Sequence, residues 1–497
     1  MARLLHRLAL VLGSVGLGLL ALAGLALALR FVQVTWLAGG PEVPHADQKA
    51  AYLASLPAVD PARAPNLVVV YFDDLGYGDL ASQGNRLIRT PRLDALATEG
   101  VRLTQFYAAA PVCTPSRAAL LTGRFPVRSE THRHVFFADG PVSTARRLVG
   151  WANAIPPDEI LLPEVLRAAG YATGMVGKWH LGDRDGSRPN DLGFDSWFGV
   201  LWSNDMQPLH VHRDGEIVER DTTERSWRGL RDEDDPRERP AGVDQGTLTA
   251  RYTDEAIAFL QRHRDGPFFL YLAHTFPHVP HFASAEQAGQ SPGGLYGDVV
   301  EDLDRSTGRL VEALERLDLS ERTLLLVTSD NGPDYDGSPG GLRGRKGDLL
   351  EGGQRVPGIV RWPGRVAPGQ VQDAPTSQLD LFPTMLGMLG LPLPEDREID
   401  GRDAASAWLD GGPSPHERLY YFAVVGDGTP AAVRDERFKY LAKRRGDYGR
   451  AKPQLSDLHA DAEAHDLIRL HPQRAAGLRA DLEAQAARIR TNPRGWR

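Results

Sequence analysis

The sequence predicts an α/β protein in which a large, mostly parallel sheet is sandwiched by helices and is followed by a small C-terminal subdomain. Two observations indicate this fold class. From residue 66 onward, short apolar runs alternate with segments of helical length, as in parallel sheets that carry helices on both faces. From about Leu419 the runs become short and closely spaced, which favours antiparallel strands, and a helix from about His471 to Arg490 closes the chain.

The individual elements follow from apolar runs and from the residues that flank them. In the larger part, the expected strands are 66–72, 171–177, 267–275 and 323–330. The expected helices are 90–100, 161–170, 253–263 and 296–319, with Gly100 ending the first and Thr253 capping the third. In the smaller part, the expected strands are 419–425, 431–436 and 438–443.

The N-terminal segment is strongly apolar. Leu8 to Leu29 carry no charge, and Arg3 and Arg7 precede this run. The run is longer than the roughly 7–15 residues of a signal-peptide core and meets the roughly 20 residues of a membrane span. The early arginines favour a cytoplasmic N-terminus. We therefore expect an exported protein, either anchored in the membrane and facing the periplasm or the extracellular side, or secreted after cleavage. A buried core helix is the remaining alternative.

Composition divides the chain and limits its partners. We divide it into a segment 1–38 that is an anchor or signal, a Gly-, Pro- and Ala-rich linker 39–65, a main domain 66–412 and a C-terminal subdomain 413–497. The formal net charge of −8 lacks the basic footprint of a nucleic-acid-binding protein. The single cysteine, Cys113, rules out an internal disulfide bond.

Oxygen-bearing side chains follow two of the predicted strands. Asp73 and Asp74 come after the first strand, and Asp330 and Asn331 come after the strand that begins at Thr323. Ligands of open parallel sheets bind beyond the carboxyl ends of the strands, where converging carboxylates need a counter-charge. Each motif alone is also typical of a turn, but together they favour a hard divalent cation. Three carboxylates and one amide favour Ca²⁺ over Mg²⁺.

The string "CTPSRAALLTGR" places Cys113 at the start of a helix. Pro115 fits the first helical position, and Gly123 fits the C-terminal stop, so we expect Cys113 just before the helix. Free N–H groups and the partial positive charge at a helix N-terminus suit an anion, and Arg117 adds a fixed cation. The segment therefore suits a tetrahedral oxyanion beside residue 113. A buried small hydrophobe is the alternative for a lone cysteine.

The same string, "CTPSR" closed by "LTGR", resembles the signature of the type I sulfatases of the alkaline phosphatase superfamily, with the texture of the arylsulfatase A-like branch. The segments "NLVVVYFDDLGYGDL", "GYATGMVGKWHLG", "HVPHF" and "GLRGRKGDLLEGGQRVPGIVRWPG" extend the resemblance from about Asn66 to Leu467. The resemblance implies an alkaline phosphatase-like fold in which 66–412 is the catalytic domain. It also implies hydrolysis of an aryl or carbohydrate sulfate ester to alcohol and sulfate.

The resemblance further implies a role for each matching residue. A modifying enzyme oxidises Cys113 to formylglycine, whose hydrate attacks the sulfate sulfur through one hydroxyl and expels sulfate through the other. The metal ligands that it implies, for Ca²⁺ or alternatively Mg²⁺, are Asp73, Asp74, Cys113, Asp330 and Asn331. The catalytic residues that it implies are Cys113, Arg117, Lys178, His180, His278 and Lys346. The substrate-binding residues that it implies are Ser203, Lys178, His278 and Lys346.

Two other functions are open from the sequence. The first is a phosphonate or phosphate monoester hydrolase of the same superfamily, because sulfuryl and phosphoryl groups have similar shapes. The second is a non-catalytic protein that binds sulfated glycans and keeps Cys113 unmodified. Residues 125–156 match no landmark of the family and are a candidate lid or substrate-facing loop. His132, His134 and Trp151 are the candidate substrate contacts there.

Overall fold

The computed structural model describes residues 43–135, 137, 141–148, 153–222, 242–424, 426–442, 452–460 and 463–497, together with six residues between 22 and 29. Within these ranges, no helix combines the length and apolar character needed to cross a membrane. The apolar run Leu8–Leu29, which is predicted to be an anchor or a signal, lies mostly outside them.

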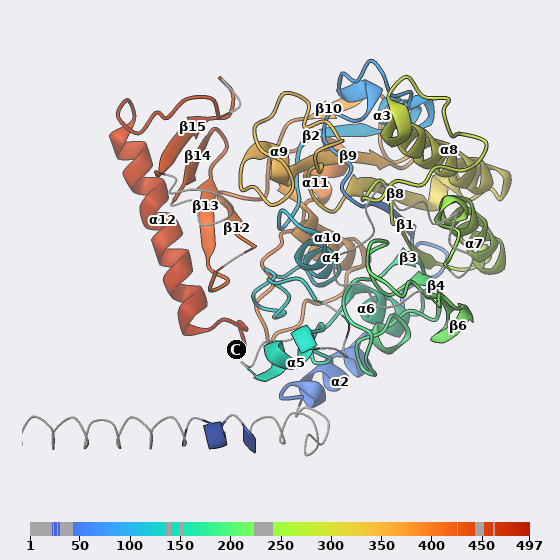
Figure 1. The fold of residues 1–497 in the computed structure, drawn as a ribbon, viewed down its shortest axis with the longest axis horizontal. Coiled ribbons are helices and arrows are strands. Elements are labelled where there is room, and N and C mark those ends of the chain that lie inside the picture. Colours follow the sequence, from blue (N-terminus) through green and yellow to red (C-terminus); the bar gives the residue numbers. More distant parts are fainter. Residues whose placement is uncertain are drawn as a thin grey trace, which may run out of the picture.

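A large sheet forms the centre of the fold (Figure 1). Its middle strands are parallel, in the order β8 (Thr323–Ser329), β1 (Asn66–Phe72), β7 (Phe268–Ala273), β3 (Ala172–Lys178) and β4 (Ser196–Val200). At one edge, β9 (Arg355–Arg361) runs antiparallel between β8 and β2 (Val101–Tyr107), and β2 also pairs with β10 (Gln370–Gln372) and β11 (Thr376–Ser377). At the other edge lies the hairpin β5 (Val211–Arg213) and β6 (Glu216–Glu219). The predicted α/β fold with a mostly parallel sheet is confirmed.

The sheet is buried on both faces, and strand β1 shows why its sequence is continuously apolar. Leu67, Val69 and Tyr71 belong to the core on one face, and alternate residues such as Val68 and Val70 belong to the core on the other. The helices that contribute to the first core are α4 (Cys113–Thr122), α6 (Leu162–Ala168), α10 (Leu381–Leu389) and α11 (Ala405–Asp410). Those that contribute to the second core are α3 (Pro91–Glu99), α7 (Leu248–His263) and α8 (Gly294–Arg316).

Helices depart from the predicted boundaries at three places. Helix α2 (Ala46–Ser55) lies inside the expected linker, where its buried Lys49 forms an ion pair with Glu164 at 2.6 Å. Helix α7 begins at Leu248, so Thr253 is an interior residue and not an N-cap. Helix α4 begins at Cys113 itself, with Pro115 as its third residue, because a proline without an N–H is tolerated throughout the first helical turn.

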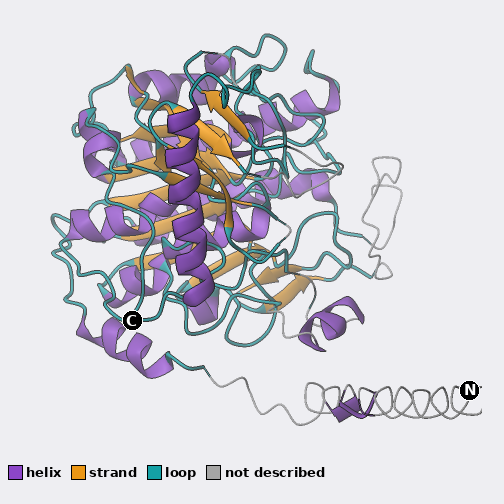
Figure 2. Cartoon of the chain, turned by 90° about the vertical axis from the view of Figure 1, so that its left-hand side faces the viewer, coloured by secondary structure: helices purple, strands orange, loops and turns teal. Residues whose placement is uncertain are grey.

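A separate antiparallel sheet and helix α12 (Pro472–Thr491) form the C-terminal layer (Figure 1). The strands, in order, are β12 (Leu419–Phe422), β13 (Pro430–Arg434), β14 (Phe438–Leu441) and β15 (Gln454–Asp457). Figure 2 shows α12 lying in front of this part of the molecule. Buried Lys439 of β14 lies 3.1 Å from Glu463 of the same part and 3.0 Å from Glu351 of α9 (Glu351–Gln354), and the contact with Glu351 joins the small sheet to the segment that leads into β9. Helix α5 (Pro141–Leu148) lies between α4 and α6 in the sequence.

Candidate active site

The candidate site lies where β1 and β8 end side by side. These strands are parallel neighbours that are paired through their last residues, so the side chains that follow them gather at one edge of the sheet. Asp73 and Asp74 follow β1, and Asp330 and Asn331 follow β8. The backbone N–H of Asp74 donates to Oδ1 of Asp330 at 3.0 Å, which joins the two strand ends. All four side chains are buried.

Cys113, the first residue of α4, brings its sulfur to this edge. Its Sγ lies 3.3 Å from Oδ1 of Asp73, and the thiol and the three carboxylates offer ligand atoms that lie within 4.8 Å of one another. The loop before the helix is closed by Ser116, whose hydroxyl donates to the carbonyl of Ala110 at 2.7 Å. Gly123 ends the helix with a φ of 66°, as predicted. These contacts define the two ends of α4, and Arg117 of the same helix donates to Asp330 at the end of β8, which holds Cys113 near the sheet edge.

Each carboxylate of the cluster has a cationic partner. The pairs are Arg117 with Asp330 at 3.0 Å, Lys178 with Asp73 at 2.5 Å and Lys346 with Asp74 at 2.7 Å. From the carboxylates alone, the sequence favours a metal ion as their counter-charge. Because these long side chains already supply three positive charges, repulsion among the carboxylates does not by itself require a metal ion.

Asn331 provides the observation that favours a cation. Its Nδ2 donates to Oδ1 of Asp74 at 2.7 Å and to the carbonyl of Gly332 at 2.9 Å, which orients the amide. Its Oδ1 is buried and has no hydrogen-bond partner in the described part of the chain. Buried acceptors normally have a partner, and amide and carboxylate oxygens are ligands of Ca²⁺ and Mg²⁺. The donor set therefore fits a hard divalent cation.

Two histidines flank the cluster. Both ring nitrogens of His180 are buried without a hydrogen-bond partner among the described residues, and burial holds its pKa well below the usual range. The Nδ1 of His278 lies 2.5 Å from the carbonyl of Val279 and donates to it, because a carbonyl only accepts. The Nε2 of His278 lies 3.4 Å from the hydroxyl of Ser203 and 3.8 Å from Oδ2 of Asp74.

Burial and neighbouring charges shift the pKa values of the cluster in different directions. Burial opposes the ionisation of Asp73, but Lys178 and Arg117 together hold its pKa well below the usual range. Burial and the charge of Asp73 raise the pKa of Asp330 to about 7. Burial, with the charges of Asp330 and Asp73, also raises the pKa of the Cys113 thiol well above its usual range. Without a bound cation, Cys113 is therefore a neutral thiol at pH 7.

Two site residues have a left-handed backbone conformation. The φ angle is 70° at Asp74 and 59° at His180. Such angles in residues other than glycine cost about 1–3 kcal/mol and cluster at functional sites. The hydrogen bonds from Asp74 N to Asp330 and from His180 N to the carbonyl of Leu201 hold the two residues in place.

The structure brings the predicted site residues together. Ser203, for example, accepts a hydrogen bond from Nζ of Lys178 at 3.1 Å. Of the candidate substrate contacts that the structure describes in the segment 125–156, only one is shown to contact a site histidine. His134 packs against His180 with ring centroids 5.7 Å apart, whereas His132 contacts Arg133. Trp151 lies outside the described residues.

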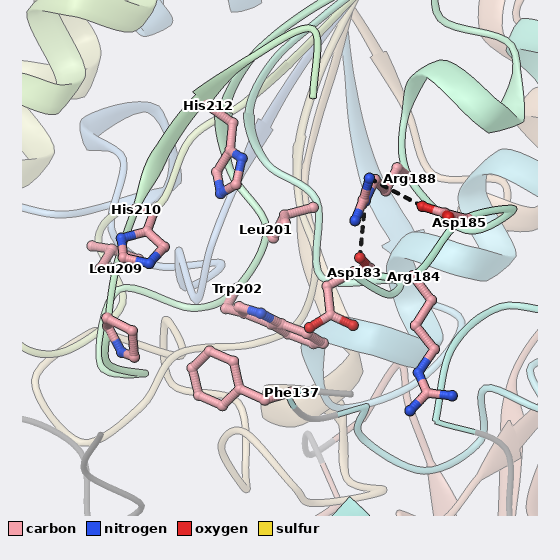
Figure 3. Close-up of a pocket in the computed structure, with 11 residues that line it drawn as sticks. Phe137, Asp183, Arg184, Asp185, Arg188, Leu201, Trp202, Leu209, His210 and His212 are labelled. Carbon is pink, nitrogen blue, oxygen red and sulfur yellow. Dashed lines mark hydrogen bonds and ion pairs between the residues drawn. The ribbon is translucent and has the colours of Figure 1, made fainter. Parts of the chain in front are cut away.

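A cavity of about 610 Å³ borders the site at Trp202 (Figure 3). The ring centroid of Trp202 lies 6.1 Å from that of His180 and 5.2 Å from that of Phe137, so the indole contacts both a site histidine and another residue that lines the cavity. Sequence reasoning missed Trp202, although it directly precedes Ser203. A buried tryptophan carries no sequence signal that separates a cavity wall from the core.

Comparison with known proteins identifies the family of the chain. Residues 65–391 match the sulfatase family model. The chain belongs to the sulfatase family. This sulfatase is 38% identical to the steryl-sulfatase of Rattus norvegicus, in a match that covers 73% of the chain and 74% of the relative. It is 40% identical to the N-acetylgalactosamine-6-sulfatase of Mus musculus over 375 residues, which cover 72% of the chain and 68% of the relative.

A solved structure agrees with these relatives. The PsFucS1 sulfatase from Pseudoalteromonas sp. superposes with a TM-score of 0.73 at 26% identity, over 91% of this sulfatase and 96% of that chain. The resemblance to the type I sulfatases and the alkaline phosphatase-like fold are therefore confirmed. The predicted activity is confirmed as well: this sulfatase is a sulfuric ester hydrolase that acts on sulfate esters.

Proposed function

We propose that this sulfatase cleaves an aryl or carbohydrate sulfate ester with a formylglycine made from Cys113 and a divalent cation held beside it. The observation that supports this proposal most directly is the position of the Cys113 sulfur, 3.3 Å from Asp73 and within the group of three carboxylates. A nucleophile at that position lies both at a helix N-terminus and beside a cation site. Both features stabilise an attacking oxygen and the anionic group that it attacks.

The residues that would hold the cation are Asp73, Asp74, Asp330, Asn331 and residue 113. When bound, the cation polarises a sulfate oxygen and stabilises negative charge on the attacking oxygen. We favour Ca²⁺, with Mg²⁺ as the alternative, because a set so rich in oxygen suits the higher coordination number of Ca²⁺. The unpartnered Oδ1 of Asn331 supports this assignment.

Cys113 suits modification better than direct attack. The raised pKa of its thiol leaves little thiolate, which is the nucleophilic form, and sulfur attacking sulfate would leave an adduct with no simple exit. Oxidation of Cys113 by a formylglycine-generating enzyme would give an aldehyde whose hydrate carries two hydroxyl groups. One hydroxyl serves as the nucleophile, and loss of the proton from the other restores the aldehyde as sulfate leaves.

Arg117 and Lys178 position the anionic groups. The guanidinium of Arg117 is held by Asp330 and by the carbonyl of Lys178, to which Nη1 donates at 2.9 Å, so it presents a fixed positive charge behind residue 113. The Nζ of Lys178 lies between Asp73 and Ser203, at 2.5 and 3.1 Å. It is therefore placed to contact a sulfate oxygen from within the cluster, with Ser203 as a neighbouring donor.

Three further residues are suited to hydrogen bonding, proton transfer and charge compensation. His180 is neutral because burial lowers its pKa, so one of its ring nitrogens can accept a hydrogen bond from the second hydroxyl of residue 113 and orient it. The Nε2 of His278 is the ring atom that can hold a proton for the departing alcohol, since Nδ1 donates to a backbone carbonyl. Lys346, whose pKa is held well above its usual range beside Asp74 in spite of burial, stays charged and can stabilise the leaving oxygen.

A peptide-mass measurement tests the modification. Conversion of Cys113 replaces the thiol by a carbonyl oxygen and lowers the mass of the tryptic peptide 103–117, and we expect this change in protein coexpressed with a formylglycine-generating enzyme. Cys113→Ala should abolish release of sulfate from 4-nitrophenyl sulfate, whereas Arg63→Met, at an exposed arginine, should not change it. An unmodified peptide in protein that hydrolyses the ester would contradict the proposal.

A substrate comparison separates the rival functions. The purified, modified protein should turn over an aryl sulfate with a higher kcat/KM than the matching aryl phosphonate or aryl phosphate. The reverse order would favour the phosphonate or phosphate monoester hydrolase. Binding of sulfated glycans without turnover of any ester by the modified protein would favour the non-catalytic alternative.

We also propose that the protein is exported and is held at the membrane by its N-terminal segment. The uncharged run from Leu8 to Leu29, preceded by Arg3 and Arg7, supports this proposal. N-terminal sequencing of the protein from the membrane and the soluble exported fractions would distinguish an anchor from a cleaved signal. Recovery of the intact chain from the cytosol alone would contradict export.

A further inference from the structure

We propose that the cavity beside Trp202 is a subsite for an uncharged sugar unit linked to the sugar that carries the scissile sulfate. This inference rests on the proposed function and names its substrate class. Trp202 contacts both His180 and Phe137, with ring centroids 6.1 and 5.2 Å apart. Trp202 also lines the cavity (Figure 3), so a group bound there would contact a side chain that itself contacts His180 of the site.

The lining of the cavity has an apolar wall and a polar wall. Phe137 and Trp202, with the aliphatic Leu201 and Leu209, form the apolar wall. The polar residues, together called the polar wall, lie on both sides of Leu201 and Trp202: His210 and His212 on one side, and Asp183, Arg184, Asp185 and Arg188 on the other (Figure 3). A sugar ring has the same division, because its C–H face packs on aromatic side chains while its hydroxyl groups need donors and acceptors at the edge. The volume of about 610 Å³ lies in the range of small-ligand sites.

The charges of the polar wall cancel. It contains two carboxylates, Asp183 and Asp185, and two guanidinium groups, Arg184 and Arg188, and Arg188 forms an ion pair with Asp185 at 3.2 Å. Burial lowers the pKa of His212 to about 4. The wall therefore has no net charge at neutral pH, which favours a neutral sugar over a uronic acid or a second sulfated unit.

His210 and the position of Arg188 show how hydroxyl groups would be bound. The Nδ1 of His210 accepts a hydrogen bond from the backbone N–H of Asp221 at 3.0 Å, so in the neutral ring Nε2 carries the proton and is a donor. Burial lowers the pKa of His210, in keeping with the neutral ring. Arg188 is oriented by the carbonyl of Asp183 at 2.9 Å. Fixed donors of this kind recognise hydroxyl groups with little loss of side-chain entropy.

The same wall disfavours a steroid in the cavity. A fused hydrocarbon ring system would remove the Arg188 ion pair and the neighbouring carboxylates from water without giving them new hydrogen-bond partners, which costs free energy. The sequence identities do not separate the two cases, because steryl-sulfatases and N-acetylgalactosamine-6-sulfatases match the chain almost equally well. The chemistry of the cavity therefore selects the saccharide.

The test compares substrates that differ only in the unit that would occupy the cavity. We expect N-acetylgalactosamine 6-sulfate linked to an unsulfated neutral hexose to have a KM about tenfold below that of the monosaccharide sulfate, as one or two net hydrogen bonds would provide. A matched disaccharide with a uronic acid should show a smaller gain. A steroid sulfate should have a lower kcat/KM than the neutral disaccharide.

Variants locate the effect in the cavity. Arg184→Met and His210→Phe should each remove most of the advantage of the neutral disaccharide over the monosaccharide, mainly through KM. Arg63→Met makes the Arg184 replacement at another exposed arginine and should leave that ratio unchanged. The inference is overturned if the second sugar gives no advantage, if the uronic acid or the steroid is preferred, or if neither cavity variant alters the ratio.

A binding experiment distinguishes failure of this inference from failure of the proposed function. Calorimetry with Cys113→Ala and the unsulfated disaccharide measures occupancy of the cavity without any chemistry. Binding that weakens in the Arg184→Met background supports the subsite even if no ester is hydrolysed, in which case the proposed function fails alone. If Cys113→Ala does not bind the disaccharide while the modified protein with Cys113 intact releases sulfate from the monosaccharide, the subsite is overturned and the proposed function stands.

Discussion

Removing the guanidinium of Arg117 tests how the charged cluster is held together. This side chain is fully buried. It donates to Asp330 through Nε at 3.2 Å and Nη2 at 3.0 Å, and to the carbonyl of Lys178 through Nη1 at 2.9 Å. Arg117→Met retains much of the apolar stem but leaves Asp330 without these donors. The variant therefore isolates the charge and its hydrogen bonds from the packing.

The expected loss of stability follows from leaving a buried charge without its partner. Breaking a buried ion pair on one side costs about 3–5 kcal/mol when the charge persists. Because Asp330 can take up a proton instead, we expect a smaller loss, about 1–3 kcal/mol, in the free energy of unfolding at pH 8. The pKa of Asp330, already raised to about 7 by burial and Asp73, makes the cost depend on pH. At pH 6 the carboxyl is mostly protonated and needs Arg117 less, so the loss should be smaller there.

The assay is denaturant unfolding, followed by tryptophan fluorescence, of chelator-treated protein at pH 6 and pH 8. Arg117→Lys keeps a charge but not the planar fork and should be intermediate, and Arg63→Met is the exposed control. Sulfate release by modified Arg117→Met should fall by about 100-fold or more, as when one donor to a developing anion is removed. A midpoint equal to that of Arg63→Met at pH 8 would refute the electrostatic account of the cluster.

Three further changes test the fold and the cation site. Burial lowers the pKa of His274 to about 3, below its unfolded value of 6.5, so stability should be lost as the pH falls from 6.5 towards 3. His274→Gln should reduce the loss between pH 7 and pH 5 by about 2 kcal/mol in urea unfolding, and an unchanged loss would exclude this contribution. Lys439→Met leaves Glu351 and Glu463 buried without their shared cation and should lower the free energy of unfolding by about 3–5 kcal/mol, partly restored by adding Glu351→Gln. Asn331→Leu should weaken Ca²⁺ binding by about tenfold or more, measured as a smaller Ca²⁺-induced rise in Tm, and an unaltered rise would remove Asn331 from the ligand set.

Local patterns predicted the elements that are buried on both faces. The run Asn66–Phe72 is apolar at nearly every position, because both faces of β1 pack against helices, and its predicted bounds equal the observed ones. Helix α2 was missed for the opposite reason. Its composition resembles that of a linker. Its tertiary contacts include those of Lys49 with the carboxylate of Glu164 and with the carbonyl of Glu159, which come more than a hundred residues later in the chain.

The sequence by itself determined which chemical groups stand at the ends of β1 and β8 and at the start of α4, because strand burial and helix capping depend on neighbouring residues. Only the tertiary structure decided how the charges pair, as when Arg117 meets Asp330 across 213 positions of the chain. It also decided that Trp202 forms the wall of a cavity beside His180. Charge pairing, pKa shifts and cavity shape depend on distances of a few ångströms between remote segments, and a linear pattern does not encode those distances.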